Sequence, residues 1–135
     1  MTPVPILYDA GCGFCCWSLA QVLRLDRRGR LQPVPLQDPE AERLLLGMAH
    51  DERMASWHLV DEDGRVHSGG DAFPPLLRLI PGGGPFARVL ARFPSLADSG
   101  YRAVADRRSW LGRLIPAGGA ARARERIEAA AKRGR

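Results

Sequence analysis

Three cysteines lie within five residues near the start of this 135-residue chain, at Cys12, Cys15 and Cys16. Thiols this close in sequence cannot cross-link distant segments, so they do not form a disulfide framework that holds a fold together. Clustered cysteines in a chain without such a framework indicate either redox chemistry or metal binding. The cysteine cluster is therefore the first candidate for a functional site.

Cys12 and Cys15 form a Cys-Gly-Phe-Cys motif where a short apolar run, residues 6–8, gives way to a helical pattern that begins at Phe14. The first N–H groups of a helix are unpaired and its N-terminus carries a partial positive charge, so a thiolate is stabilised there. The thiolate is the form of cysteine that attacks disulfides. The sequence thus predicts Cys12 as an exposed nucleophile and Cys15, one helical turn further on, as a sheltered resolving thiol in thiol–disulfide exchange.

Two neighbours of this motif have open roles. Asp9 stands three residues before Cys12. Its carboxylate either takes part in catalysis, by accepting a proton from Cys15 or orienting the loop, or bonds nearby backbone N–H groups as an ordinary turn residue. Cys16 is rotated about 100° around the helix from Cys15, so it faces elsewhere. We expect Cys16 to be a small buried hydrophobic residue.

Metal binding is the competing use of the cysteines. A structural zinc site needs four ligands, usually including a second ligand pair. The chain offers only His50, His58 and His67, which form no pair with suitable spacing. We therefore predict no metal and no cofactor. The alternative function is a non-catalytic thioredoxin-like binding module that holds a partner or a metal at the Cys-x-x-Cys loop.

The elements that must position the dithiol follow from hydrophobic periodicity and turn residues. Pro33 and Pro35 remove backbone donors from the same side of one strand, which places that strand at a sheet edge. Ser95, with Asp98 three residues later, predicts a capped helix start. The expected elements are strands at 6–8, 31–36, 57–60 and 65–68 and helices at 14–26, 39–48, 73–80, 86–93 and 95–111.

The order of these elements is β-α-β-α-β-β-α, followed by extra C-terminal helices. A strand–helix–strand start gives a parallel pair with a right-handed crossover, and the later hairpin adds antiparallel strands. The sequence therefore predicts an α/β protein with a thioredoxin-like mixed four-stranded sheet. We expect residues 1–116 to form this domain, with a core closed by large apolar residues near its end, namely Trp110, Leu111, Leu114 and Ile115.

Residues 117–135 form a basic tail rich in Ala and Arg. Six cations against two anions give the tail +4 of the net charge of +5, so the body is nearly neutral and nucleic-acid binding is not supported. Burial of Ile127, its one large aliphatic residue, gains about 1.5–3 kcal/mol, too little to order the whole segment. We expect the tail to be helical or partly disordered, and solvated rather than docked.

The segment Tyr8-Asp9-Ala10-Gly11-Cys12-Gly13-Phe14-Cys15 resembles the signature of the DCC family (DUF393) of predicted thiol-disulfide oxidoreductases. That family is named for an Asp and two Cys at the spacing of Asp9, Cys12 and Cys15. The resemblance covers about residues 4–116 and implies a thioredoxin-like fold and dithiol redox activity. It continues in later blocks, at residues 56–60, 63–64, 69–72 and 101–108.

Two features depart from the patterns that this resemblance suggests. Ala10 stands where the family usually has Gly, and a methyl group at this turn is tolerated. Thioredoxins place a cis-proline before the third strand, whereas residues 53–56 contain no proline. Peptide docking of the thioredoxin kind is therefore not predicted.

The predicted function is a thiol-disulfide oxidoreductase with Cys12, Cys15 and Asp9 as its catalytic residues. Its partners would be a protein or small-molecule disulfide and a thiol electron donor. No apolar run approaches the roughly 18 residues of a membrane span, and Thr2, Pro3 and Pro5 interrupt any signal segment. We expect a soluble cytoplasmic protein.

Overall fold

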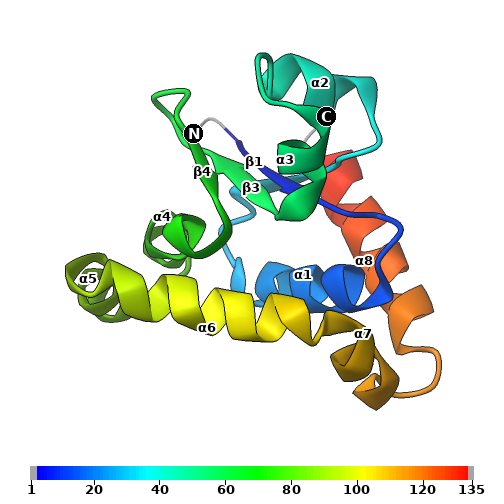
Figure 1. The fold of residues 1–135 in the computed structure, drawn as a ribbon. Coiled ribbons are helices and arrows are strands. Elements are labelled where there is room, and N and C mark those ends of the chain that lie inside the picture. The colour runs from blue at the N-terminus through cyan, green and yellow to red at the C-terminus, as the bar shows by residue number, and fades with distance from the viewer. Residues whose placement is uncertain (1–2, 134–135) are drawn as a thin grey trace.

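Four strands form one mixed sheet with the order β2-β1-β3-β4 (Figure 1). The structure is a computed structural model and describes residues 3–133. β1 pairs in parallel with β2 and antiparallel with β3, and β3 and β4 form the expected hairpin. This arrangement confirms the predicted mixed sheet and is consistent with a thioredoxin-like fold. The strands are β1 (Val4–Tyr8), β2 (Leu31–Pro35), β3 (His58–Val60) and β4 (Val66–Ser68).

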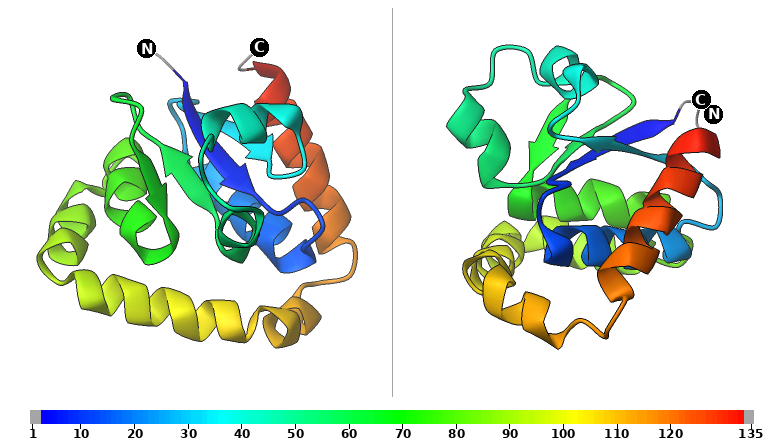
Figure 2. Two further views of the ribbon diagram at one scale, coloured as in Figure 1. Left: turned by 45° about the horizontal axis from the view of Figure 1, so that its top comes forward. Right: turned by 90° about the vertical axis from the view of Figure 1, so that its right-hand side faces the viewer.

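Helices cover both faces of the sheet (Figure 2). On one face lie α1 (Gly13–Leu25), α4 (Phe73–Leu79) and α8 (Gly119–Arg133), and on the other α2 (Pro39–Leu44) and α3 (His50–Ala55). The remaining helical elements are η1 (Gly69–Ala72), α5 (Gly84–Arg92), α6 (Pro94–Asp106), α7 (Arg108–Leu111) and η2 (Gly112–Leu114).

The central strand β1 supplies both cores. Its side chains alternate between the two faces because successive residues of a strand point in opposite directions. Val4, Ile6 and Tyr8 are buried with α1, α4 and α8, whereas Leu7 is buried with β2 and α2. Burial on both faces fixes the strand, and therefore fixes where the loop that follows Tyr8 emerges.

The crossover from α1 to β2 is held by a buried carboxylate. Asp26 is only 7% exposed, and its two oxygens accept hydrogen bonds from the backbone N–H groups of Arg30, at 3.1 Å, and Leu31, at 2.9 Å. Gly29 in the same turn has φ +63°, a conformation that favours glycine. β2 lies at the sheet edge, as its two prolines predict.

Several helix boundaries differ from the sequence expectations. The expected helix at 39–48 ends at Leu44 and a turn follows, in which Gly47 has φ +91°. α3 then follows as an unpredicted second helix. The expected helix at 95–111 begins at Pro94 without a side-chain cap, so the predicted cap is wrong. That helix is also divided at Arg107, where the backbone leaves helical geometry between α6 and α7.

The expectation that the basic tail is undocked is corrected by α8. Ala123, Ile127 and Ala130 are buried in the same core cluster as the inner face of α1. The Gln32 side chain of β2 also donates to the carbonyl oxygen of Ala131, at 3.2 Å. Because alanine side chains are small, they let two helix backbones approach closely. The packing energy then comes from many small contacts, which a count of large aliphatic residues does not include. Residues 134–135 of the tail lie outside the described residues.

The residues expected to close the core lie elsewhere. Trp110 is 57% exposed and Leu114 is 64% exposed, while Leu111 and Ile115 are partly buried. Instead, α8 packs along α1 on this side of the core, as Figure 2 shows.

Candidate active site

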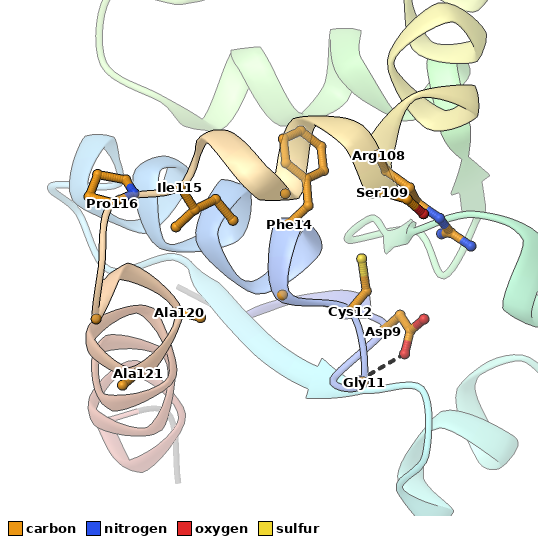
Figure 3. A pocket seen from close by; sticks show the side chains of 13 residues that line it. Asp9, Gly11, Cys12, Phe14, Arg108, Ser109, Ile115, Pro116, Ala120 and Ala121 are labelled. Carbon is orange, nitrogen blue, oxygen red and sulfur yellow. Dashed lines mark hydrogen bonds between the residues drawn. The ribbon is translucent and has the colours of Figure 1, made fainter.

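A short loop joins β1 to α1 and carries the predicted site. The carbonyl oxygen of Asp9 accepts a hydrogen bond from the N–H of Cys12 at 3.2 Å, which closes the turn. The Asp9 carboxylate accepts another from the N–H of Gly11 at 2.9 Å (Figure 3). Asp9 therefore makes the bond of an ordinary turn residue, and this bond also orients the loop.

Gln37, a residue that the sequence analysis did not single out, clamps this loop from outside. Its amide nitrogen donates to the Asp9 carboxylate at 2.8 Å, and its amide oxygen accepts from the N–H of Ala10 at 3.2 Å. Gln37 follows β2, which pairs in parallel with β1, so the ends of both strands meet at one edge of the sheet. The contact could not be inferred without knowing the register in which β1 and β2 pair.

Cys12 is the N-cap residue of α1. Its backbone is extended, with φ −105° and ψ 114°, and its Sγ accepts a hydrogen bond from the N–H of Cys15 at 3.4 Å. Capping of this kind satisfies one of the free N–H groups at a helix start. An N–H donor therefore faces the Cys12 sulfur, where it can stabilise negative charge that develops on that atom during exchange.

Cys15 lies in a different environment one turn along the helix. Burial raises the pKa of its thiol to about 12, with further contributions from the hydrogen bond and charge of Cys12. The positive charge of Arg108 lowers this pKa, and the negative charge of Asp9 raises it. Cys15 is therefore a protonated thiol at neutral pH, which is the state expected of a resolving cysteine before it reacts.

Cys16 is 1% exposed, which confirms that it is a buried residue. Its thiol donates to the carbonyl oxygens of Ala10, at 3.7 Å, and Asp9, at 3.9 Å. Burial is the largest cause that raises the pKa of Cys16. Cys16 packs beneath the loop and lines neither the groove nor any other space beside Cys12.

Cys12 opens onto a groove of about 600 Å³. In Figure 3 its sulfur points into this groove, between Phe14 of α1 and the α7 residues Arg108 and Ser109. The far wall is formed by residues 115–121, several of which are glycine or alanine. The groove is open to solvent, so Cys12 can be reached from outside.

The three histidines do not join the cysteines. His58 is fully buried, with Nε2 2.8 Å from the carbonyl oxygen of Arg53 and Nδ1 2.6 Å from the hydroxyl of Ser68. His67 pairs with Asp61 at 2.7 Å. Over residues 3–133, no group of three or more His, Cys, Asp or Glu side chains is placed to hold a metal ion.

Comparison with known proteins identifies the family. A sequence model described as DCC1-like thiol-disulfide oxidoreductase matches residues 6–114. The chain belongs to this family. The match spans Asp9, Cys12 and Cys15 and assigns DCC1-like proteins to thiol–disulfide chemistry in general. Searches of curated proteins and of solved structures found no match. None of the helices within residues 3–133 is both long and apolar enough to cross a membrane.

Proposed function

We propose that this DCC1-like protein catalyses thiol–disulfide exchange, with Cys12 as the attacking thiolate and Cys15 as the resolving thiol. The observation that carries the proposal is the N-cap contact, in which the N–H of Cys15 donates to the Cys12 sulfur at 3.4 Å. The contact places an N–H donor against the sulfur that would attack the substrate, while Cys15, whose pKa is raised to about 12 by burial, stays protonated. Clustered cysteines without a disulfide framework support a reducing, cytoplasmic setting.

In the first step, the Cys12 thiolate attacks one sulfur of a substrate disulfide. A bond forms between Cys12 and that sulfur, the substrate disulfide breaks, and the other substrate sulfur leaves as a thiolate that takes up a proton. The open groove gives space for a protein disulfide or a small-molecule disulfide beside Cys12.

In the second step, Cys15 loses its proton and its thiolate attacks the Cys12 sulfur. The mixed disulfide breaks, the second substrate thiol is released, and Cys12 and Cys15 become joined. Two electrons have then passed from the dithiol to the substrate. Arg108 supports this step, because its positive charge stabilises the thiolate form of Cys15 against the cost of burial.

Asp9 is proposed as the third member of the site. Its hydrogen bonds to Gly11 and Gln37 keep the loop in place. It also lies within electrostatic reach of Cys15, whose pKa it raises, so it is a candidate to accept the Cys15 proton. An Asp9→Asn variant separates the two roles, because Asn keeps an oxygen acceptor for the loop but cannot take a proton at neutral pH.

The roles of the cysteines are tested by single Ser variants in an insulin-reduction assay with dithiothreitol. Cys12→Ser should lose the catalysed rate, and Cys15→Ser should stall as a mixed disulfide at Cys12 that mass spectrometry detects. A brief iodoacetamide pulse at pH 7 should label Cys12 well before Cys15. Cys16→Ser is the matched control, because Cys16 is buried and should leave the rate nearly unchanged. Dominant labelling of Cys16, or full activity without Cys12, would disprove the assignment.

A further inference from the structure

A second cavity, of about 480 Å³, lies between α1 and α6. This volume is within the range of small-molecule binding sites, and the lining is predominantly apolar. Its aromatic wall is a chain of three rings, with Trp57 and Phe73 centred 5.2 Å apart and Phe73 and Tyr101 6.1 Å apart. The few polar groups in it include Ser18, Ser56 and Arg108.

The space exists because α6 rests on η1 and not on α1. Gly70 of η1 touches the backbone of α6, and a Cβ atom on Gly70 would be 2.6 Å from the Cα of Asp98. One turn along, the Tyr101 ring packs on Gly69, with a closest distance of 3.5 Å to the ideal Cβ position there. These glycines set the position of α6, and the room that is left in front of α1 is the cavity.

The two cysteines of the dithiol line different spaces. Cys12 lines the open groove and Cys15 lines the apolar cavity. Asp9, Phe14 and Arg108 border both spaces and form the partition between them. A molecule in the cavity therefore reaches Cys15 from a space that Cys12 does not line.

We propose that this cavity binds the electron donor, an apolar low-molecular-weight dithiol, which reduces the Cys12–Cys15 disulfide by attack at Cys15. The proposal rests on the exchange reaction proposed above. It assigns the groove to the disulfide substrate and the cavity to the donor.

The donor dithiol alone supplies both electrons that the reduction of the Cys12–Cys15 disulfide needs. One donor thiolate attacks the Cys15 sulfur, the bond between Cys15 and Cys12 breaks, and Cys12 leaves as a thiolate. The second donor thiolate then attacks the donor sulfur bound to Cys15. The donor departs as a cyclic disulfide, and Cys15 leaves as a thiolate and takes up a proton. The donor has lost two electrons and the protein has gained them.

Attack at Cys15 has two physical advantages. Attack on a disulfide sulfur is in line with the bond that breaks, so the attacking thiolate must reach Cys15 from a space that Cys12 does not occupy, and Cys12 is absent from the lining of the cavity. The better leaving group is the sulfur whose developing negative charge is better stabilised, and the Cys12 sulfur accepts a hydrogen bond from the N–H of Cys15. Access usually decides which sulfur reacts, and here the cavity gives access to Cys15.

Reaction with a monothiol shows which of the two sulfurs, Cys12 or Cys15, is attacked. The oxidised full-length protein is mixed with 2-phenylethanethiol and quenched with iodoacetamide, and its peptides are analysed by mass spectrometry. The expected product carries the phenylethylthio group on Cys15, as a mixed disulfide, and the carbamidomethyl group from iodoacetamide on Cys12. The opposite distribution would overturn the proposal and leave Cys12-centred exchange intact, whereas loss of the insulin-reduction dependence on Cys12 would overturn the proposed function itself.

Cavity-filling variants test where the donor binds. Ala105 lines the cavity from α6, and Ala103 lies on the same helix but is exposed and outside the lining. Ala105→Phe should slow reduction by dihydrolipoamide by at least about tenfold, equal to lost burial of about two methylene groups. It should leave reduction by the polar dithiothreitol unchanged, because dithiothreitol can attack Cys12 from the open groove. Ala103→Phe should change neither rate.

If Ala105→Phe has a lower Tm than the wild-type protein, Ser18→Leu on α1 repeats the test from the opposite wall of the cavity. Dihydrolipoamide rates that are unaffected by both fillings would overturn the proposal. So would a wild-type protein that reacts no faster with dihydrolipoamide than with dithiothreitol at equal thiolate concentration.

Discussion

Ile127→Ala tests whether the C-terminal helix is part of the folded domain. Ile127 is 3% exposed and packs in the core cluster that α1 and β1 share. Truncation of a buried Ile to Ala costs about 2–5 kcal/mol, from lost burial and the cavity left behind. For a domain of this size each kcal/mol lowers Tm by about 3–5 °C, so we expect a decrease of about 6–25 °C.

The assay is thermal unfolding followed by circular dichroism, with urea unfolding as a second measurement. Arg126→Ala is the matched control, because Arg126 is the preceding residue in the same helix and is exposed. Its Tm should remain within about 2 °C of the wild-type value, as is usual for surface positions. A similarly small shift for Ile127→Ala would refute the docked helix and restore the solvated tail that composition suggests.

Two further predictions concern groups outside the dithiol. Burial is the main cause that lowers the pKa of His58 below its ordinary value of 6.5, with its hydrogen bond to Arg53 opposing. The unfolded chain then binds the proton more readily, so stability should fall as pH drops below about 6.5, by up to about 1.4 kcal/mol per pH unit, in urea unfolding at several pH values. Gly70→Ala should destabilise the fold and displace α6, because its methyl group would meet the backbone of Asp98 at 2.6 Å. Its effect is measured as a lower Tm together with a changed fluorescence of Trp57, which lines the cavity.

Each of these two predictions, for His58 and for Gly70, has a control variant. His58→Gln should flatten the pH dependence whatever its effect on stability at neutral pH, whereas His50→Gln, at an exposed position, should keep the wild-type slope. An unchanged slope in His58→Gln would contradict the assignment to His58. For Gly70→Ala the control is Gly100→Ala, where an added Cβ meets nothing within 4 Å. Equal Tm values for the two alanine variants would show that the Gly70 contact is not tight.

The pair of cysteines and their place in the fold could be predicted from local sequence. The apolar run that ends at Tyr8 and the helical pattern from Phe14 put Cys12 at a helix start, and the structure has it there as the N-cap residue. Pro33 and Pro35 likewise predict an edge strand, because a missing N–H can be tolerated only where no neighbouring strand needs it. Such inferences hold because the physical cause lies within a few residues of its effect.

The surroundings of the dithiol were decided by tertiary structure. Gln37 reaches Asp9 across 28 residues of chain, and Arg108 affects Cys15 from a helix far along the sequence. Nothing in the local pattern around either residue marks it as part of the site. The pairing of β2 with β1 and the position of α7 bring them there.

The C-terminal helix shows where an expectation from composition fails. From the sequence, Ile127 alone could not order the tail, yet α8 docks through Ala123, Ala130 and Ile127 together. The gain depends on how closely two backbones approach, which is a property of the packed pair and not of either segment. In the same way, Gly70 has no visible role in the sequence until α6 lies against it. The sequence by itself determined the reactive dithiol and the sheet that presents it, because both follow from local propensities. Only the tertiary structure decided what covers α1 and which space each cysteine lines, because both depend on contacts between segments distant in the chain.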